Sequence, residues 1–182
     1  MRCDPRWLLA LVLAPAVWAQ SGGYGLGQPA TPDEIKKWDF AISPDGKELP
    51  PGSGNAVEGK EIYAAQCAMC HGKTGKEGPN DKLVGGQGTL NTAKPVKTIG
   101  SYWPYATTVW DYINRAMPYN KPGSLKPDEV YAVTAYLLYL NDIIPEHENL
   151  NATTLPKVKM PNRNGFVGDP RPDWEGSSKA RR

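Results

Sequence analysis

The stretch Cys67-Ala68-Met69-Cys70-His71 constrains this chain more than any other, because it is a C-x-x-C-H motif. Two thiols three positions apart on the last turn of a helix reach the two vinyl groups on one edge of a porphyrin, and each adds across a vinyl group to form a thioether. The next residue, His71, then lies under the iron and supplies a neutral imidazole nitrogen as the proximal ligand. The motif predicts one haem c, attached covalently through Cys67 and Cys70.

Two other kinds of site use a C-x-x-C pair, and the rest of the sequence argues against both. A thioredoxin-like redox pair follows a strand in a βαβ unit, and the sequence shows no such unit. A zinc site needs more ligands, whereas the chain has one further cysteine, Cys3, and one further histidine, His147. Haem attachment is therefore the interpretation that the motif favours.

Residues 1–19 have the pattern of a cleaved export signal. Arg2 and Arg6 precede an apolar run at 7–17, and a small-x-small cleavage pattern ends at Ala19. The run is short for a membrane span and contains a proline, so that an uncleaved anchor is the alternative. Cleavage removes one cysteine and leaves the two of the haem motif. Export to the periplasm or another extracytoplasmic space agrees with the motif, since haem c is attached outside the cytoplasm.

The 182 residues are enough for one domain with extensions, and composition divides the part after the signal into three. A Pro/Gly-rich N-terminal arm at 20–55 contains too many prolines for a long helix. The core domain follows at 56–145. The segment 146–182 has no apolar period and several prolines, which predicts an extended C-terminal tail. Three apolar side chains are expected to anchor the arm on the core: Trp38, Phe40 and Ile42.

Apolar periodicity predicts three helices in the core domain, at 57–70, 107–116 and 127–141. The first leads into the haem motif. The second is expected to begin with Thr107 or Thr108 as its cap and to end before a proline. The third starts with Pro-Asp-Glu, which suits a first turn. The sequence therefore predicts an all-α domain around the haem.

The second iron ligand has to come from residues after the haem motif. Candidates with a suitable donor atom are Met117, Met160 and His147, since Met69 lies within the attachment loop and cannot cross the ring. Met117 is favoured because it lies where the second helix ends against Pro118, so that its side chain projects onto the distal face. Core packing explains a methionine elsewhere, and an open iron position is the remaining alternative.

Ser101-Tyr102-Trp103 lies in the loop just before the second helix. The tyrosine hydroxyl or the indole N–H is expected to donate a hydrogen bond to a haem propionate. Packing of both rings in an aromatic core is the alternative.

Positive charge is concentrated around the haem motif. Residues 60–126 hold nine Lys or Arg against four Asp or Glu, whereas residues 21–59 hold three against six. An ordinary solvated surface and a basic collar that steers an acidic protein partner both explain this excess. The candidates for the collar are Lys73, Lys76, Lys82, Lys94, Lys97 and Lys121. Nucleic-acid binding is disfavoured because the basic residues are scattered and accompany no recognition motif.

The order of these features resembles class I cytochromes c: a helix, C-x-x-C-H, a loop, a helix that ends in Met-Pro and a C-terminal helix. The resemblance implies a class I cytochrome c fold, with three main helices around one covalent haem. Gly59 and Tyr63 resemble the residues of the first helix that contact the C-terminal helix, here around Tyr136 and Leu137. Pro79 resembles the proline whose carbonyl orients the proximal histidine.

Several stretches narrow the resemblance to the cytochrome subunits of bacterial sulfur-compound dehydrogenases, the Sox sulfane dehydrogenase and periplasmic sulfite dehydrogenase. These stretches are 50–54, 85–90, 97–107, 115–118 and 160–166. The Sox subunit resembles a two-haem chain, whereas this sequence has a single C-x-x-C-H. That departure favours a stand-alone acceptor for a sulfite-oxidising molybdenum enzyme, or a shortened relative of the Sox subunit.

The resemblance implies an electron-transfer protein that is not itself an enzyme. It would accept single electrons from a periplasmic molybdenum-containing sulfite or sulfane dehydrogenase and pass them to a terminal oxidase or another cytochrome. One alternative is a haem enzyme or sensor, which needs an open iron position and distal acid–base groups. The other is a permanent cytochrome subunit of an exported dehydrogenase complex, with the arm and the tail as the interface.

Overall fold

The computed structural model describes residues 27–168, so the expected export signal at 1–19 lies outside it. The chain divides after Asp39 into two compact units. Within the described range, none of the helices combines the length and the apolarity that crossing a bilayer requires.

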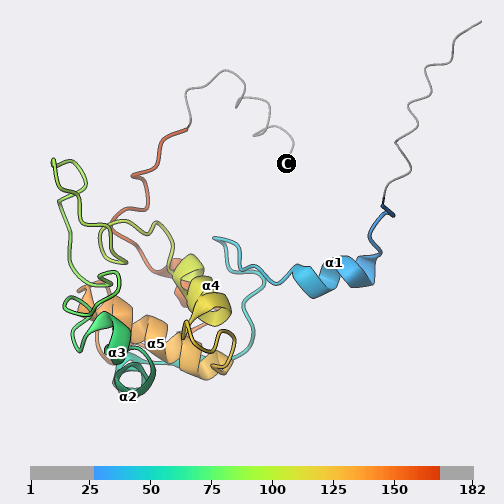
Figure 1. Ribbon diagram of the computed structural model, residues 1–182, viewed down its shortest axis with the longest axis horizontal. Helices are drawn as coiled ribbons and strands as arrows, with labels where there is room; N and C mark the ends of the chain where they lie inside the picture. Colours follow the sequence, from blue (N-terminus) through green and yellow to red (C-terminus); the bar gives the residue numbers. More distant parts are fainter. Residues whose placement is uncertain (1–26, 169–182) are drawn as a thin grey trace, which may run out of the picture. The chain divides into compact units, whose positions relative to one another are not determined.

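Helix α1 (Pro32–Trp38) is the one helix in the described part of the first unit, and its own caps hold it. The Thr31 hydroxyl accepts a hydrogen bond from the Glu34 N–H at 3.3 Å, and the Glu34 carboxylate accepts one from the Thr31 N–H at 2.8 Å. Figure 1 shows its two turns in blue. None of its residues is buried.

Of the three residues expected to anchor the arm on the core, Ile42 is buried. Phe40 is 50% exposed, with the Arg115 guanidinium 5.9 Å from its ring centroid, so it lies at the surface of the core and not inside it. Trp38 belongs to the first unit, and its contact with the core stays a prediction. The Ile42 N–H donates to the buried carboxylate of Asp111 at 3.1 Å. The arm therefore joins the hydrophobic core from Ile42 onward.

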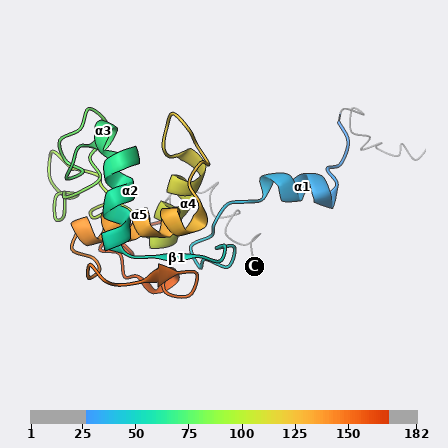
Figure 2. The same cartoon turned by 90° about the horizontal axis from the view of Figure 1, so that it is seen from below.

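The second unit is built on the crossing of α2 (Ala56–Gln66) and α5 (Pro127–Leu140), which Figure 2 shows. A Cβ atom added to Gly59 would lie 1.9 Å from the Ala132 carbonyl oxygen, so the backbones touch at this glycine. One turn later the rings of Tyr63 and Tyr136 lie 5.3 Å apart, centroid to centroid. The expected contact between the first and last helices is confirmed, with Ala132 and Tyr136 as its centre.

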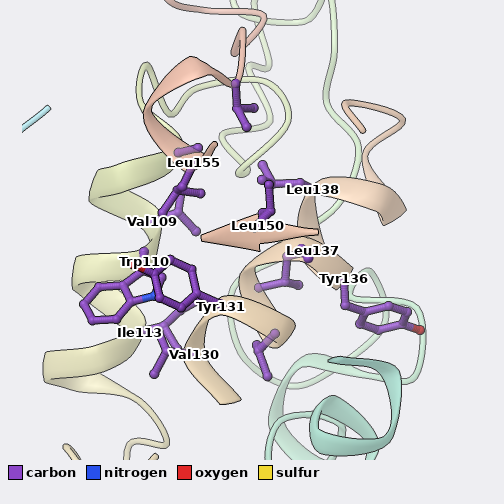
Figure 3. Packing of buried hydrophobic residues seen from close by; sticks show 14 of the residues in the cluster. Val109, Trp110, Ile113, Val130, Tyr131, Tyr136, Leu137, Leu138, Leu150 and Leu155 are labelled. Carbon is purple, nitrogen blue, oxygen red and sulfur yellow. The ribbon is translucent and has the colours of Figure 1, made fainter. Parts of the chain in front are cut away.

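Helix α4 (Ala106–Ala116) packs against α5, and the rings of Trp110 and Tyr131 lie 5.3 Å apart between them (Figure 3). The expected threonine cap is wrong, since Tyr105 holds the N-cap position without a side-chain bond. The Thr107 hydroxyl donates to the Pro44 carbonyl at 3.1 Å instead, and thereby fastens the arm to the first turn of α4.

Residues 146–160 belong to the fold, so the expectation of an extended tail is wrong for this part. Strand β2 (Leu150–Asn151) pairs antiparallel with β1 (Ser53–Gly54), and a short 3₁₀ helix, η2 (Leu155–Lys157), follows. Leu150 and Leu155 are completely buried and Met160 is 3% exposed. These apolar residues enter the core from strand, turn and 3₁₀ structure, which is why they show no single period.

Candidate haem site

The C-x-x-C-H motif lies on a short separate helix, α3 (Ala68–His71), because α2 ends at Gln66. The expected continuous helix at 57–70 is therefore broken at Cys67, whose φ and ψ are −121° and −36°. Both thiols are free and partly buried. Burial, with a smaller contribution from the neighbouring Cys70, raises the pKa of the Cys67 thiol to about 11, so this thiol is protonated at neutral pH.

The ring of His71 is held in one orientation. Its Nδ1 atom lies 2.9 Å from the Asp81 carbonyl oxygen, which can only accept, so Nδ1 is the donor and the neutral form of the ring offers the lone pair of Nε2 to a metal. The expected partner was the carbonyl of Pro79, and the structure places the contact two residues later. The Asn80 N–H donates to the Cys70 carbonyl at 3.0 Å, which draws the following peptide beside the ring.

The backbone after the motif is fixed from two sides. The Tyr63 hydroxyl donates to the Gly72 carbonyl at 2.9 Å, and burial raises the pKa of this phenol, so it remains a donor. A Cβ atom on Gly78 would lie 2.2 Å from the Cys70 carbonyl oxygen, so only glycine lets this loop approach the motif. The sequence indicated Tyr63 as a packing residue and gave no sign of its hydrogen bond.

The carboxylate of Glu77 organises the loop between the motif and Gly78. It accepts hydrogen bonds from the Thr74 hydroxyl at 2.6 Å, the Thr74 N–H at 3.0 Å and the Lys76 N–H at 3.0 Å. These bonds, led by the two from Thr74, lower the pKa of Glu77 from 4.5 to about 2.

We expect the loop to loosen in acid through this group. The folded-state pKa lies below the unfolded one, so the stabilisation is present above about pH 4.5 and is lost as the pH falls through about 2. The protection of the Thr74 and Lys76 amides against exchange, taken relative to the intrinsic rate at each pH, should fall over this range more than in the rest of the protein. In Glu77→Gln this protection should be lost already at neutral pH, whereas Glu148→Gln, at an exposed position, should behave as wild type. Protection at Thr74 and Lys76 that stays constant as the wild type is acidified would contradict the assignment.

The candidate distal ligands have different environments. Met117 is the C-cap of α4, where the backbone turns extended (φ −123°, ψ 150°), and it is partly buried. Met160 is packed in the core, and Met69 is 82% exposed. The His147 side chain is 84% exposed beside Glu146. The assignment of the ligand to Met117 stays a prediction, and the structure places this side chain at a helix end, partly buried against the core.

The loop before α4 is closed by a residue that the sequence analysis missed, Asn141. Its side chain accepts from the Gly85 N–H at 3.0 Å and donates to the carbonyls of Leu83 at 3.1 Å and Leu137 at 2.8 Å. It is 3% exposed. The available signal was an asparagine at the expected end of the third helix, because a polar side chain there can bond the backbone groups that a helix end leaves free.

The side chains of Tyr102 and Trp103, which belong to this loop, are partly buried. The Tyr102 ring lies 5.2 Å from the ring of Phe166, and the Lys97 ammonium lies 5.0 Å from its centroid. The Trp103 ring meets the ring of Tyr112 edge to face at 5.7 Å. Each ring thus has an aromatic neighbour, and the bond of either residue to a propionate stays a prediction.

The chemistry of these residues fits a covalent haem. The chain offers two free thiols, an imidazole whose Nδ1 faces a carbonyl oxygen, and a thioether at a helix end, which are kinds of donor that a haem c uses. The indole Nε1 of Trp110 is a buried donor without a partner among the described residues.

The comparisons with known proteins agree with this chemistry. The family model for cytochrome c matches residues 56–141. Thiosulfate dehydrogenases from Psychrobacter arcticus and Stutzerimonas stutzeri are 28% identical over 114 residues and 32% identical over 111 residues. These matches cover 56% and 55% of this chain but 32% and 35% of the relatives, so the chain spans about a third of their length.

A solved structure covers more of the chain. A chain in the crystal structure of the sulfane dehydrogenase SoxCD from Paracoccus pantotrophus is 42% identical, with a TM-score of 0.72. The match covers 88% of this chain and 79% of that one. A cytochrome c domain implies a covalent haem, and Cys67 and Cys70 are present to bind it. With this fold, this site and these relatives, the chain belongs to the cytochrome c family and is an electron carrier related to sulfane and thiosulfate dehydrogenases.

Proposed function

We propose that this cytochrome binds one haem c through Cys67 and Cys70, with His71 and Met117 as the two axial ligands. When bound, the haem supplies one iron that changes between the ferric and ferrous states, and a soft thioether ligand favours the ferrous state. The protein holds the imidazole through the Asp81 carbonyl. The end of α4 presents the thioether.

We propose further that the electron donor is an exported molybdenum-containing dehydrogenase that oxidises sulfite or sulfane sulfur. The observation that carries this proposal is the 42% identity to a chain of the sulfane dehydrogenase SoxCD over 88% of this chain. A terminal oxidase or another cytochrome is the acceptor. The export pattern at 1–19 supports the periplasm as the compartment in which the cytochrome and its donor react. Sequencing the amino terminus of the mature protein tests whether this signal is cleaved.

The basic collar provides a docking surface for such a donor. All six collar lysines are exposed, and none forms an ion pair with a carboxylate within 27–168. Electron transfer needs only a brief approach of the two centres, so weak and fast docking steered by charge is sufficient.

We expect the second-order rate of reduction by the dehydrogenase to fall as salt rises. The Debye length shrinks from about 10 Å at 0.1 M to about 3 Å at 1 M, which screens the collar. The double change Lys73→Glu and Lys121→Glu should lower the rate and flatten its salt dependence in stopped-flow reduction with dehydrogenase and sulfite. The matched control, Lys157→Glu with Lys159→Glu, reverses two exposed lysines of the C-terminal segment. It should retain the wild-type rate and the wild-type salt dependence. If the reduced dehydrogenase fails to reduce the cytochrome at any salt concentration, the donor assignment is wrong.

A permanent complex with the dehydrogenase is the second candidate, because the first unit exposes apolar side chains that nothing in 27–39 covers. Trp38 is 81% exposed and Ile35 is 53% exposed. A permanent subunit would co-elute with the dehydrogenase in gel filtration at high salt, whereas a shuttle carrier would elute alone. Reduction that is fast but insensitive to salt and charge reversal would also favour the permanent complex.

A further inference from the structure

Asp111 is a buried carboxylate on α4, six residues before Met117. The residue is 6% exposed, and carboxylates are rarely buried without partners. Its Oδ1 accepts from the Ile42 N–H at 3.1 Å and from the Arg115 Nε–H at 2.9 Å, while its Oδ2 accepts from Arg115 Nη2. One side chain therefore joins the arm, the middle of α4 and its last turn.

We propose that Asp111 is a positioning residue for the distal ligand. It holds the last turn of α4 against the arm, so that Met117 leaves the helix in a single direction. This inference rests on the proposed ligation of the haem iron by Met117.

The end of α4 needs such support. As the C-cap, Met117 keeps one helical bond, from its N–H to the Ile113 carbonyl at 3.0 Å, and then turns extended. Helix ends open more readily than helix centres. Arg115 lies in the last turn, where a cation is favourable, and the carboxylate fixes its guanidinium in a two-bond fork.

The arm holds α4 at two separate places. Near the start of the helix, the Thr107 hydroxyl donates to the Pro44 carbonyl at 3.1 Å. Farther along, Asp111 accepts from the N–H of Ile42, which is itself buried in the core. Loss of the carboxylate thus frees the half of the helix that carries Met117 and leaves the first turn attached.

The test is Asp111→Asn in the haem-loaded, full-length protein. Asparagine keeps the shape, but its NH₂ group opposes the Arg115 guanidinium, so the fork is lost. Imidazole binding to the ferric protein measures how often the iron position is open, because the apparent affinity scales with that population. We expect imidazole to bind about tenfold more tightly, since losing a charge-assisted bond changes an equilibrium by about this factor or more. The reduction potential should fall as well.

Asp128→Asn is the matched control. Its Oδ1 also accepts from a backbone N–H, that of Ser53 at 2.8 Å, but at an exposed position between α5 and β1 and not on α4. This variant should bind imidazole as wild type does. Arg115→Lys keeps the positive charge but loses the two-bond fork, so it should also bind imidazole more tightly than wild type. This variant replaces Asp111→Asn in the test if Asp111→Asn fails to fold.

An unchanged imidazole affinity in Asp111→Asn, with a lowered unfolding midpoint, would show a purely structural role and overturn the inference. The proposed ligation fails separately, if Met117→Ala keeps the far-red Met–iron band of the ferric protein. The two failures are therefore distinguishable by different variants.

Discussion

Gly59→Ala should destabilise the protein by about 2 kcal/mol or more, although alanine is the better helix former. The helix propensity alone would stabilise α2 by about 1 kcal/mol. The added Cβ, however, would lie 1.9 Å from the Ala132 carbonyl oxygen and 2.5 Å from its carbon. Both atoms belong to the α5 backbone, so no rotamer change relieves the clash and the two helices have to separate. Denaturant unfolding followed by helical circular dichroism measures the loss.

The opposite substitution on the same helix separates the two effects. Ala64 lies on the exposed side of α2, so Ala64→Gly should cost only the propensity difference of about 1 kcal/mol. If Gly59→Ala were neutral or stabilising, the close crossing of α2 and α5 would be wrong.

Met117→Ala should abolish the far-red Met–iron charge-transfer band of the ferric protein and lower its reduction potential. The reason is the loss of the soft thioether that favours ferrous iron. Optical spectroscopy and a redox titration of the haem-loaded protein are the measurements.

Two other methionines serve as controls. Met160→Ala removes a side chain that is 3% exposed in the core, so it should cost about 2–5 kcal/mol of stability and leave the band intact. Met69→Ala alters a residue that is 82% exposed and should change neither property. A wild-type band in Met117→Ala would exclude Met117 as the distal ligand. A lost band in Met160→Ala would assign the ligand to Met160 instead.

The sequence was sufficient for those parts of the protein in which one local pattern decides the structure. The C-x-x-C-H spacing predicted a cytochrome c domain, and the apolar residues that recur from Val130 to Ile144 predicted a helix at 127–141, now seen as α5 at Pro127–Leu140. Gly59 pointed to a helix crossing because a helix interior otherwise disfavours glycine.

Other parts depend on contacts between distant residues, which no local pattern encodes. Leu150 and Leu155 are buried in a two-residue strand and a short 3₁₀ helix, which are too short to show an apolar period. The carbonyl beside His71 belongs to Asp81 because a hydrogen bond from Asn80 sets the loop register, and a family resemblance indicated a neighbouring residue instead. The buried bond between Asp111 and the backbone of Ile42 links residues 69 positions apart.

The pairing of β1 with β2 also has a consequence for the order in which the chain folds. Because Ser53 pairs with Asn151, the haem motif and all the main helices lie inside one long loop, which the last part of the second unit closes. Contacts between residues so distant in sequence form late, since the chain between them has to be ordered first. In chain order the cysteines precede the two leucines that complete the core, Leu150 and Leu155. The thiols are thus available for attachment chemistry while the fold is still open.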